Sequence, residues 1–298
     1  MASNEKKIGH TNKGKLIICP TPLGNLGDIT KRTLEAFSQC DVVCCEDTRV
    51  TGKLLSVLGI KKSLERLDEA TLSSKAEYIA QRVLSGEIIA YASDAGMPGV
   101  SDPGQRLVDA ALEVGAVVEV LPGPTALTTA YVASGFSAQS FYFGAFFPRK
   151  EGERKRLLSQ LKSLDAVLIF YESPLRLVSA LCALKELVPY RRVAVCRELT
   201  KIHEEVVRGT IDEVLRVFVD REKQEGIKGE IVLVIEAPNE QELRADKTSA
   251  LLSAEERVSD LLNSRQYSKK DIVRILKDEF GLTRNDAYEL VHHKGQIP

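Results

Sequence analysis

The chain has 298 residues, which exceeds one ordinary hydrophobic core and suits two compact domains with an appendage. A composition of 44% hydrophobic and 28% charged residues, with 20 Gly, 11 Pro and no Trp, excludes a disordered or a fibrous protein. The 41 lysine and arginine residues nearly balance the 42 aspartate and glutamate residues, so the net charge of -1 gives the protein no overall attraction for nucleic acid. Any nucleic-acid site must therefore be a local cluster of positive charge.

Targeting and cysteine patterns point to an intracellular protein. The first fourteen residues carry no apolar core of a signal peptide, and no later apolar run approaches the roughly 20 residues of a membrane helix. We therefore expect a cytoplasmic protein that does not bind a membrane. The six cysteines lie mostly in apolar runs, without a C-x-x-C pair or a histidine at ligand spacing, and this predicts buried thiols rather than a metal site or disulfides.

Short apolar runs alternate with helical patterns through the first 135 residues. The predicted strands are residues 15–19, 41–46, 87–94 and 116–123. Each is almost uniformly apolar, as a strand covered on both faces must be. Segments with a 3.6-residue period predict helices at residues 30–37, 49–58, 73–84 and 103–113. This alternation predicts a parallel α/β sheet.

The second half of the chain has more closely spaced strands. They are predicted to begin at Ser140, Ala166, Arg191, His203 and Gly229. The third and fourth are separated by too few residues for a parallel crossover, so we expect a mixed or antiparallel second domain. The expected organisation is a flexible tail (residues 1–14), an N-terminal α/β domain (15–123), a C-terminal α/β domain (124–238), and a linker with a three-helix extension (239–298).

The three helices of the extension have recognisable ends. The first is predicted from near Ser253, after a polar stretch read as the linker. The second follows a capping box formed by Ser268 and Asp271 and ends before Gly281. The third follows Thr283.

Glycine and proline gather after the strands of the first domain, at the sheet edge where open α/β folds bind ligands. In residues 19–30, Pro22 and Gly24 allow the backbone to approach a ligand, and Asp28 is a candidate helix cap. The pattern is not G-x-G-x-x-G, so a nicotinamide cofactor is weakly supported and a tight turn explains the loop equally well.

Charged side chains occupy the next two loops. Glu46, Asp47 and Arg49 follow the second strand, and two acids with an arginine exceed what helix capping requires. Asp94 begins a long Gly/Pro loop, where its carboxylate can accept hydrogen bonds from ribose hydroxyls or bind an ammonium group. A fourth loop enters a helix at Thr125, whose exposed amides can hold a carboxylate, although packing alone also explains its small residues.

The chain carries six sequence motifs whose wording and order together are typical of one protein family. They are TPLGNLGDIT, CEDTR, SDAGMPGVSDPG, LPGPTA, FYESPLRL and CRELTKIHEE. From about Lys15 to Glu236 the chain resembles the tetrapyrrole-methylase-like (class III) S-adenosylmethionine methyltransferases, in particular those that methylate the 2'-hydroxyl of a cytidine in 16S rRNA of the small ribosomal subunit. The resemblance implies a two-domain α/β fold with a mainly parallel first sheet, a mixed or antiparallel second sheet and a small helical extension. It also implies S-adenosylmethionine as cofactor and a homodimer.

The matching motifs imply site residues. Cofactor contacts are expected from Pro22, Asp94, Gly96, Val100, Ser101, Thr125, Ala126, Ala237 and Pro238. Methyl transfer to a hydroxyl needs no metal but needs a proton acceptor. The candidates in the motifs are Glu46, Asp47, Glu172, Glu198 and Lys201, with Arg49 nearby. We favour the group at 46–49 first and Glu198 with Lys201 second; the alternative for the second group is a strand pair whose charges neutralise each other.

Basic residues predict where RNA phosphates bind. Six cations outnumber two acids in one short stretch: Arg149, Lys150, Arg154, Lys155, Arg156 and Lys162 against Glu151 and Glu153. Arg176 and Arg197 are candidates to hold the target nucleotide. A solvated helix face is the alternative for the stretch. Two other functions stay open: C-methylation of a porphyrin or corrin precursor, and a non-catalytic ribosome-assembly factor that retains the cofactor groove.

Overall fold

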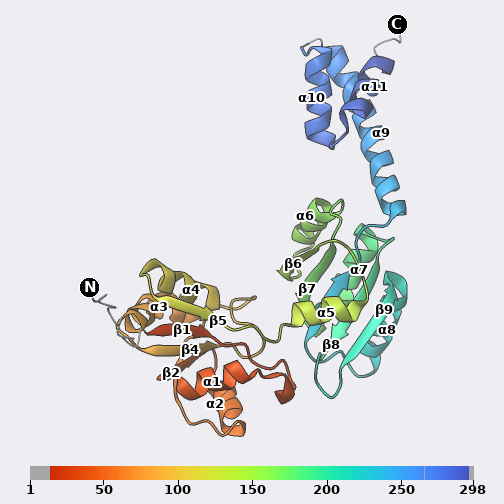
Figure 1. The fold of residues 1–298 in the computed structure, drawn as a ribbon. Helices are drawn as coiled ribbons and strands as arrows, with labels where there is room; N and C mark the ends of the chain where they lie inside the picture. Colours follow the sequence, from red (N-terminus) through yellow and green to blue (C-terminus); the bar gives the residue numbers. More distant parts are fainter. Residues whose placement is uncertain (1–13, 265, 295–298) are drawn as a thin grey trace, which may run out of the picture.

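The computed structural model describes residues 14–264 and 266–294, which form two lobes and a helical unit (Figure 1). Each lobe is built on a five-stranded sheet. The tail predicted over residues 1–14 lies outside the described residues, except for Gly14. Of the helices in the described ranges, none is both long and apolar enough to cross a lipid bilayer.

The first lobe is a parallel sheet with the strand order β3-β2-β4-β1-β5. Its strands are β1 (Lys15–Ile18), β2 (Val42–Cys45), β3 (Ser63–Arg66), β4 (Ile88–Ala92) and β5 (Val117–Val120). Its helices are η1 (Leu26–Asp28), α1 (Lys31–Gln39), α2 (Thr48–Val57), α3 (Glu69–Leu84) and α4 (Gly104–Glu113). The four predicted strands and four predicted helices are confirmed. Thr30 caps α1, so the suggestion that Asp28 does so is wrong.

Helices cover both faces of this sheet. Phe37 of α1 and Leu55 of α2 pack on one face, and Ile79 of α3 and Leu107 of α4 pack on the other. The chain therefore leaves the neighbouring strands β2 and β4 toward opposite faces. Such a divergence opens a crevice at the carboxyl edge of the sheet, where ligands of open α/β folds bind.

The second lobe has a mixed sheet with the order β6-β7-β10-β8-β9, as predicted. Its strands are β6 (Phe141–Phe146), β7 (Val167–Glu172), β8 (Arg192–Arg197), β9 (Glu205–Thr210) and β10 (Ile231–Ile235). Only β6 and β7 pair in parallel; β10 runs antiparallel to β7 and β8, and β8 antiparallel to β9.

The helices of the second lobe are α5 (Ala126–Ser134), α6 (Glu151–Leu161), η2 (Pro174–Arg176), α7 (Leu177–Leu187) and α8 (Ile211–Gln224). Helix α5 packs on one face of the second-lobe sheet, and α6, α7 and α8 cover the other face. Ala130 of α5 packs against Val232, whereas Leu181 and Phe218 pack against Leu233 on the other face. Five cysteines are buried free thiols, as predicted, but Cys182 is exposed because it lies on the solvent side of α7.

The chain ends in α9 (Glu240–Ser264), α10 (Lys269–Phe280) and α11 (Arg284–Lys294). The helix predicted from near Ser253 begins at Glu240, so the polar stretch predicted as a linker is helical; it is rich in strong helix formers, which outweigh its lack of apolar periodicity. The capping box at Ser268 and the terminal Gly281 are confirmed. Figure 1 shows α9 carrying the three-helix unit away from both lobes.

A buried ion pair ties α9 to the second lobe. Arg191, just before β8, and Glu242 are both buried, with 2.8 Å between Arg191 Nε and Glu242 Oε2. The guanidinium also donates to the carbonyl oxygen of Lys162. A charge buried in this way is tolerated only when it is paired, so the first turn of α9 is held to the body.

Candidate active site

A cavity of about 510 Å³ lies between the two lobes, and this volume is within the range of small-molecule sites. The first lobe contributes the loops after β1, β2, β4 and β5, through Leu23, Glu46, Ser93, Asp94, Ala95, Gly96, Met97, Val100, Ser101, Asp102, Thr125 and Ala126. The second lobe contributes Phe146, Tyr171, Glu172, Ser173, Pro174, Cys196, Leu199, Gly229, Glu230, Ile231 and Val232. The cavity thus lies at the crevice that the sheet topology favours.

Backbone hydrogen bonds hold the first-lobe loops in place. Thr21 and Gly96 exchange two of them, at 2.9 and 3.0 Å, and join the loop after β1 to the loop after β4. Within the second of these loops, Asp102 Oδ1 accepts from the amides of Gly99 and Gly104, at 2.6 and 2.9 Å. Ser101 adopts a φ of 66°, a left-handed conformation that costs energy for a non-glycine residue. This part of the cavity is consequently preorganised.

Acidic side chains line the first-lobe wall. Burial, with the negative charges of Asp94 and Asp102 nearby, raises the pKa of Glu46 above its ordinary value of 4.5. Burial also raises the pKa of Asp94. A wall of this kind is electronegative and favours a cationic ligand. Over the described ranges, no three His, Cys, Asp or Glu side chains gather as a metal site would require.

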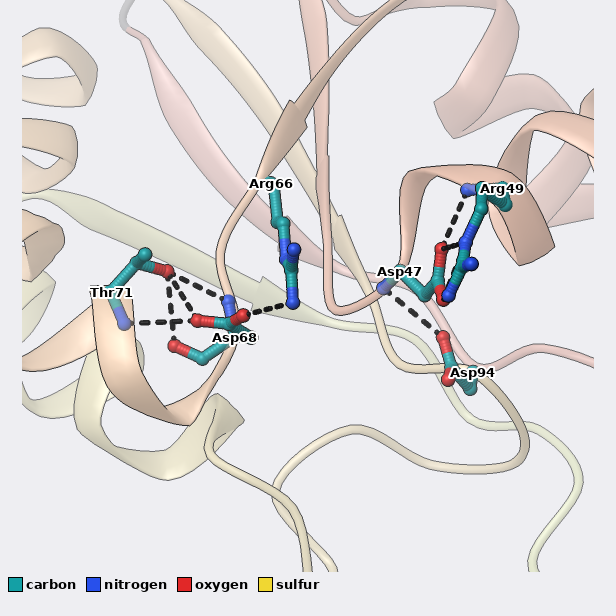
Figure 2. Close-up of polar contacts among 6 residues, drawn as sticks. All are labelled: Asp47, Arg49, Arg66, Asp68, Thr71 and Asp94. Carbon is teal, nitrogen blue, oxygen red and sulfur yellow. Dashed lines mark hydrogen bonds and ion pairs between the residues drawn. The ribbon is translucent and has the colours of Figure 1, made fainter.

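The neighbouring Asp47 is committed to local structure (Figure 2). Its Oδ1 accepts from the backbone nitrogen of Arg49 at 2.8 Å and caps α2, while Oδ2 accepts from Arg49 Nη2 at 2.6 Å. These bonds hold the pKa of Asp47 well below its usual range. The backbone nitrogen of Asp47 in turn donates to Asp94 Oδ1 at 3.2 Å. The structure therefore brings the predicted acidic group together, with the Asp47 carboxylate committed to α2 and Arg49 and its backbone nitrogen bound to Asp94.

Figure 2 also shows a comparable arrangement at the start of α3. Asp68 caps α3 by accepting from the backbone nitrogen of Thr71 at 2.9 Å, and it pairs with Arg66 at 2.6 Å. Neither Asp68 nor Arg66 lines the cavity. The Asp47 side chain makes the same kinds of bond as that of Asp68 and does not line the cavity either, and only its backbone nitrogen contacts Asp94.

On the second-lobe wall, Glu172 at the end of β7 has an unused oxygen. Oε1 accepts from the backbone nitrogen of Ser173 at 2.6 Å and pairs with Arg176 Nη2 at 2.5 Å. Oε2 is buried and has no hydrogen-bond partner among the described residues. Burial raises the pKa of Glu172, although Ser173 and Arg176 act in the opposite direction. On the facing wall, Ser93 Oγ is also buried without a partner in the described chain. Both residues line the cavity, and a buried polar atom without a partner calls for an explanation such as a bound water, ion or ligand.

A bulge in β6 directs an aromatic side chain to the cavity. The register with β7 shifts between Phe143 and Phe146, and Ala145 has a φ of 54°. Phe146 then contacts Tyr171 edge-on, with 5.7 Å between ring centroids. Phe146 stays more than half exposed while lining the cavity, so it offers an apolar surface to a ligand.

The loop after β8 bridges the lobes. Lys201 Nζ pairs with Glu198 Oε1 at 2.9 Å and with Glu230 Oε2 at 3.2 Å. Hydrogen bonding to Lys201 lowers the pKa of Glu198. Burial alone would lower the pKa of Lys201, but its bonds to Glu198 and Glu230 outweigh burial and raise this pKa. A Cβ atom added at Gly24 would lie 2.2 Å from Lys201 Cγ, so the lysine stem rests on the first lobe. Glu198 and Lys201 form an ion pair and neither residue lines the cavity. These positions fit the alternative prediction, in which the charges of this motif neutralise each other, better than a proton-accepting role.

Six of the nine residues expected to bind the cofactor line the cavity: Asp94, Gly96, Val100, Ser101, Thr125 and Ala126. Pro22 lies instead in an adjacent hollow. Ala237 and Pro238 follow the far end of β10, where Ile235 pairs with Leu168, and they do not line the cavity. Because β10 runs antiparallel to β7, its beginning at Gly229–Val232 reaches the cavity. Ala237 and Pro238 thus lie away from the cavity lining, and their contact with the cofactor stays a prediction.

The predicted RNA-binding residues divide into exposed and committed ones. Arg154 is buried and donates to the carbonyl oxygen of Pro148 at 2.7 Å and to Ser179, which removes it from the surface. Lys155 pairs with Glu151 and Glu186. Arg176 holds Glu172, and Arg197 pairs with Glu205 at 3.0 Å. The exposed cations of the set are Arg149, Lys150 and Arg156, of which Lys150 also pairs with Glu153 at 3.3 Å.

Sequence reasoning missed much of the second-lobe wall. Phe146, Tyr171, Leu199 and residues 229–232 line the cavity but were not expected there. The motifs FYESPLRL and CRELTKIHEE were the sequence signal for this wall. Our prediction selected the charged residues of those motifs rather than the apolar ones.

Comparisons with known proteins agree with the motifs. Residues 15–215 match the family described as Tetrapyrrole (Corrin/Porphyrin) Methylases. The chain is 37% identical to ribosomal RNA small subunit methyltransferase I of Bacillus subtilis (strain 168), over 96% of this chain and 97% of that protein. It is 42% identical to the protein of the same name from Thermotoga maritima, over 74% of this chain and 98% of the relative. A crystal structure of diphthine synthase superposes with a TM-score of 0.60 at 15% identity, covering 74% and 90% of the two chains.

Proposed function

Because the chain belongs to the tetrapyrrole (corrin/porphyrin) methylase family, we propose that it methylates the 2'-hydroxyl of a cytidine ribose in 16S rRNA of the small ribosomal subunit. The chain is a methyltransferase, and S-adenosylmethionine is its methyl donor. The name shared by the Bacillus and Thermotoga relatives supports ribosomal RNA as the substrate. The observation that carries the proposal is the cavity between the lobes, with ionisable Glu46 and Asp94 on one wall and buried Glu172 on the other.

The residues around the cavity fit S-adenosylmethionine. This molecule supplies a methyl group on a positively charged sulfur and carries adenine, ribose and amino-acid groups. Glu172 Oε2 and Ser93 Oγ, both buried without a partner in the described chain, match its amino and hydroxyl groups. The acidic wall at Glu46 and Asp94 favours its positive charge. The methyl-transfer product lacks the sulfonium charge, so the same wall favours the donor over the product.

Glu46 is the proton acceptor that we propose for the ribose hydroxyl. Its raised pKa makes its carboxylate a better base than an ordinary glutamate, and it lines the cavity. Asp47 is bound to Arg49, and Glu198 is bound to Lys201, so both have lowered pKa values and are weaker bases. Asp94 is the second candidate because its pKa is also raised.

Positioning and water exclusion supply the rest of the mechanism. An in-line displacement needs the hydroxyl oxygen held about 3–3.5 Å from the methyl carbon. The hydrogen-bonded loops at Thr21 and Gly96 fix the first-lobe wall, and Phe146, Tyr171 and Leu199 provide apolar surface that excludes water.

Contacts with the ribosomal subunit are assigned to exposed cations. Arg149, Lys150 and Arg156 are exposed on α6 and the turn before it, and we propose that they bind RNA phosphates. A homodimer acting in the cytoplasm is part of the same proposal; sedimentation of the purified chain measures its oligomeric state.

Labelled S-adenosylmethionine and small subunits that lack the modification test the proposal. We expect label on one cytidine ribose of 16S rRNA, located by nuclease mapping and mass spectrometry. Label on a tetrapyrrole precursor but not on RNA would support the C-methylation alternative. Tight cofactor binding in calorimetry without turnover on subunits would indicate an assembly factor instead.

A further inference from the structure

A second hollow of about 260 Å³ lies beside the cavity, on the face of the first sheet covered by α1 and α2. Residues of the loop after β1 form one wall and residues of α2 form the other: Thr21, Pro22, Gly24 and Leu26, and Val50, Thr51, Lys53, Leu54 and Val57. Ser93 and Asp94 complete it, and both also line the cavity. The two spaces therefore share one wall, and nothing in the proposed mechanism uses the second.

The second hollow has apolar sides and a cationic rim. Leu26, Val50 and Val57 are 46%, 41% and 67% exposed, and all three line the same hollow, so they form one contiguous apolar patch rather than scattered surface residues. Lys53 is exposed within the hollow. Arg49 lies one helical turn earlier, and its side chain is 86% exposed while pairing with Asp47. Apolar walls under two cations match a flat base attached to a phosphate backbone.

The shared wall offers a polar contact at the junction. Ser93 Oγ is buried and has no hydrogen-bond partner within the described residues. Asp94 is partly exposed to both spaces, and its pKa is raised by burial. A sugar whose hydroxyls reach Ser93 and Asp94 would stand between a base in the second hollow and the methyl donor in the cavity.

We propose that the second hollow receives the base of the target nucleotide, flipped out of the RNA, with its phosphate at Lys53 and Arg49. The inference rests on the proposed function and adds the site of the nucleotide. Enzymes that do chemistry on a base take that nucleotide out of the stack, at a cost that contacts in a pocket offset, and we extend this to a nucleotide whose ribose reacts. Pro22, Leu26, Val50 and Leu54 supply those contacts on both sides of the hollow.

Filling the hollow tests the assignment. Val50→Trp places an indole between the two walls, and Leu26→Glu sets a negative charge on the opposite wall. We expect either change to lower kcat/KM on small subunits at least about 100-fold, because a misplaced substrate loses that much rate. The Kd for S-adenosylmethionine should stay within about twofold of wild type, since the cofactor cavity is intact. Leu112→Trp, at an exposed site on α4, is the matched control and should behave as wild type.

The cation contact has a separate readout. Lys53→Gln should weaken the salt dependence of RNA binding by about 0.7 to 0.9 in logarithmic slope, the loss expected for one phosphate contact. Lys223→Gln, at an exposed position on α8, should leave the slope unchanged.

Direct binding decides which space holds the nucleotide. The probe is cytidine 5'-monophosphate, titrated in the presence of S-adenosylhomocysteine and followed by methyl NMR. Shifts at Val50, Leu54 and Val57 that Val50→Trp abolishes would support the assignment. Shifts confined to the cavity, or unchanged kcat/KM in both filled variants, would overturn it. Dissociation of a dimer by Val50→Trp with unchanged nucleotide binding would show an interface between copies and also overturn it. Failure of the wild-type protein to methylate RNA would refute the proposed function itself. This outcome differs from those that overturn only the nucleotide site, because they leave wild-type methylation intact.

Discussion

The substitution Glu46→Gln isolates proton acceptance from packing and binding. Glutamine keeps the size and hydrogen-bonding reach of the side chain but cannot take the proton of a hydroxyl. General-base assistance is typically worth 10² to 10⁴ in rate. At about 1.36 kcal/mol per decade, this is roughly 2.7–5.4 kcal/mol of transition-state stabilisation. We therefore expect the single-turnover methylation rate to fall by that factor.

The pH dependence of the methylation rate provides an independent test of the role of Glu46. Burial and the neighbouring acids raise the pKa of Glu46 above 4.5, and only its carboxylate form accepts a proton. The wild-type rate should be maintained above this raised pKa and should decline as the pH falls through it. Asp94→Asn removes a negative neighbour, so it should move this decline to lower pH while also weakening nucleotide positioning.

Two measurements would refute the role of Glu46. Single-turnover rates within about threefold of wild type in Glu46→Gln would be too small for a general base. An unchanged acid limb in the same variant would assign that limb to another group. Glu35→Gln, an exposed glutamate on α1, is the matched control and should change neither quantity.

Three further predictions concern contacts outside the reacting groups. Gly24→Ala places a methyl group against the stem of Lys201, so the two lobes that enclose the cavity can no longer approach as closely there. We expect this to weaken cofactor binding several-fold in calorimetry, although neither residue lines the cavity; Lys201→Ala in the same chain should largely restore binding, and absence of this rescue would contradict the contact. Glu242→Ala leaves the guanidinium of Arg191 buried and unpaired, and we expect a loss of about 3–5 kcal/mol in chemical denaturation or faster proteolysis of α9, whereas unchanged values of both would disprove the tie. Two arginines lower the pKa of Glu205, so its stabilising contribution is present above pH 4.5 and is lost as the pH falls through the lowered value; Glu205→Gln should flatten this part of the stability curve, and an equally steep curve would exclude it.

Local patterns were sufficient for most of the elements and for the first-lobe wall. The run VVCC is apolar throughout because β2 is buried on both faces, and the sequence shows this directly. Loops that follow parallel strands must meet at one sheet edge, so Asp94, Thr125 and Glu46 could be placed together without coordinates. The edge strand β3 was missed because SLER contains a single strongly apolar residue and lacks the uniform pattern of its neighbours.

The second-lobe wall depends on information that local patterns do not contain. The direction of β10 relative to β7 decides whether Gly229 or Ala237 reaches the cavity, and strand direction is set by tertiary packing. Arg154 was expected at the surface because its neighbours are charged, but it is buried and donates a hydrogen bond to Ser179 on α7. The burial of Glu172 Oε2 without a partner in the described chain likewise follows from tertiary packing and not from local sequence.

The described chain passes from the first lobe to the second once, through residues 121–125, and Thr125 and Ala126 at the end of this passage also line the cavity. Any rotation of one lobe against the other would have to occur about this passage and would therefore displace two residues of the cavity wall. If the lobes open to exchange the cofactor, a bound donor would by thermodynamic reciprocity oppose opening as strongly as closure favours the donor.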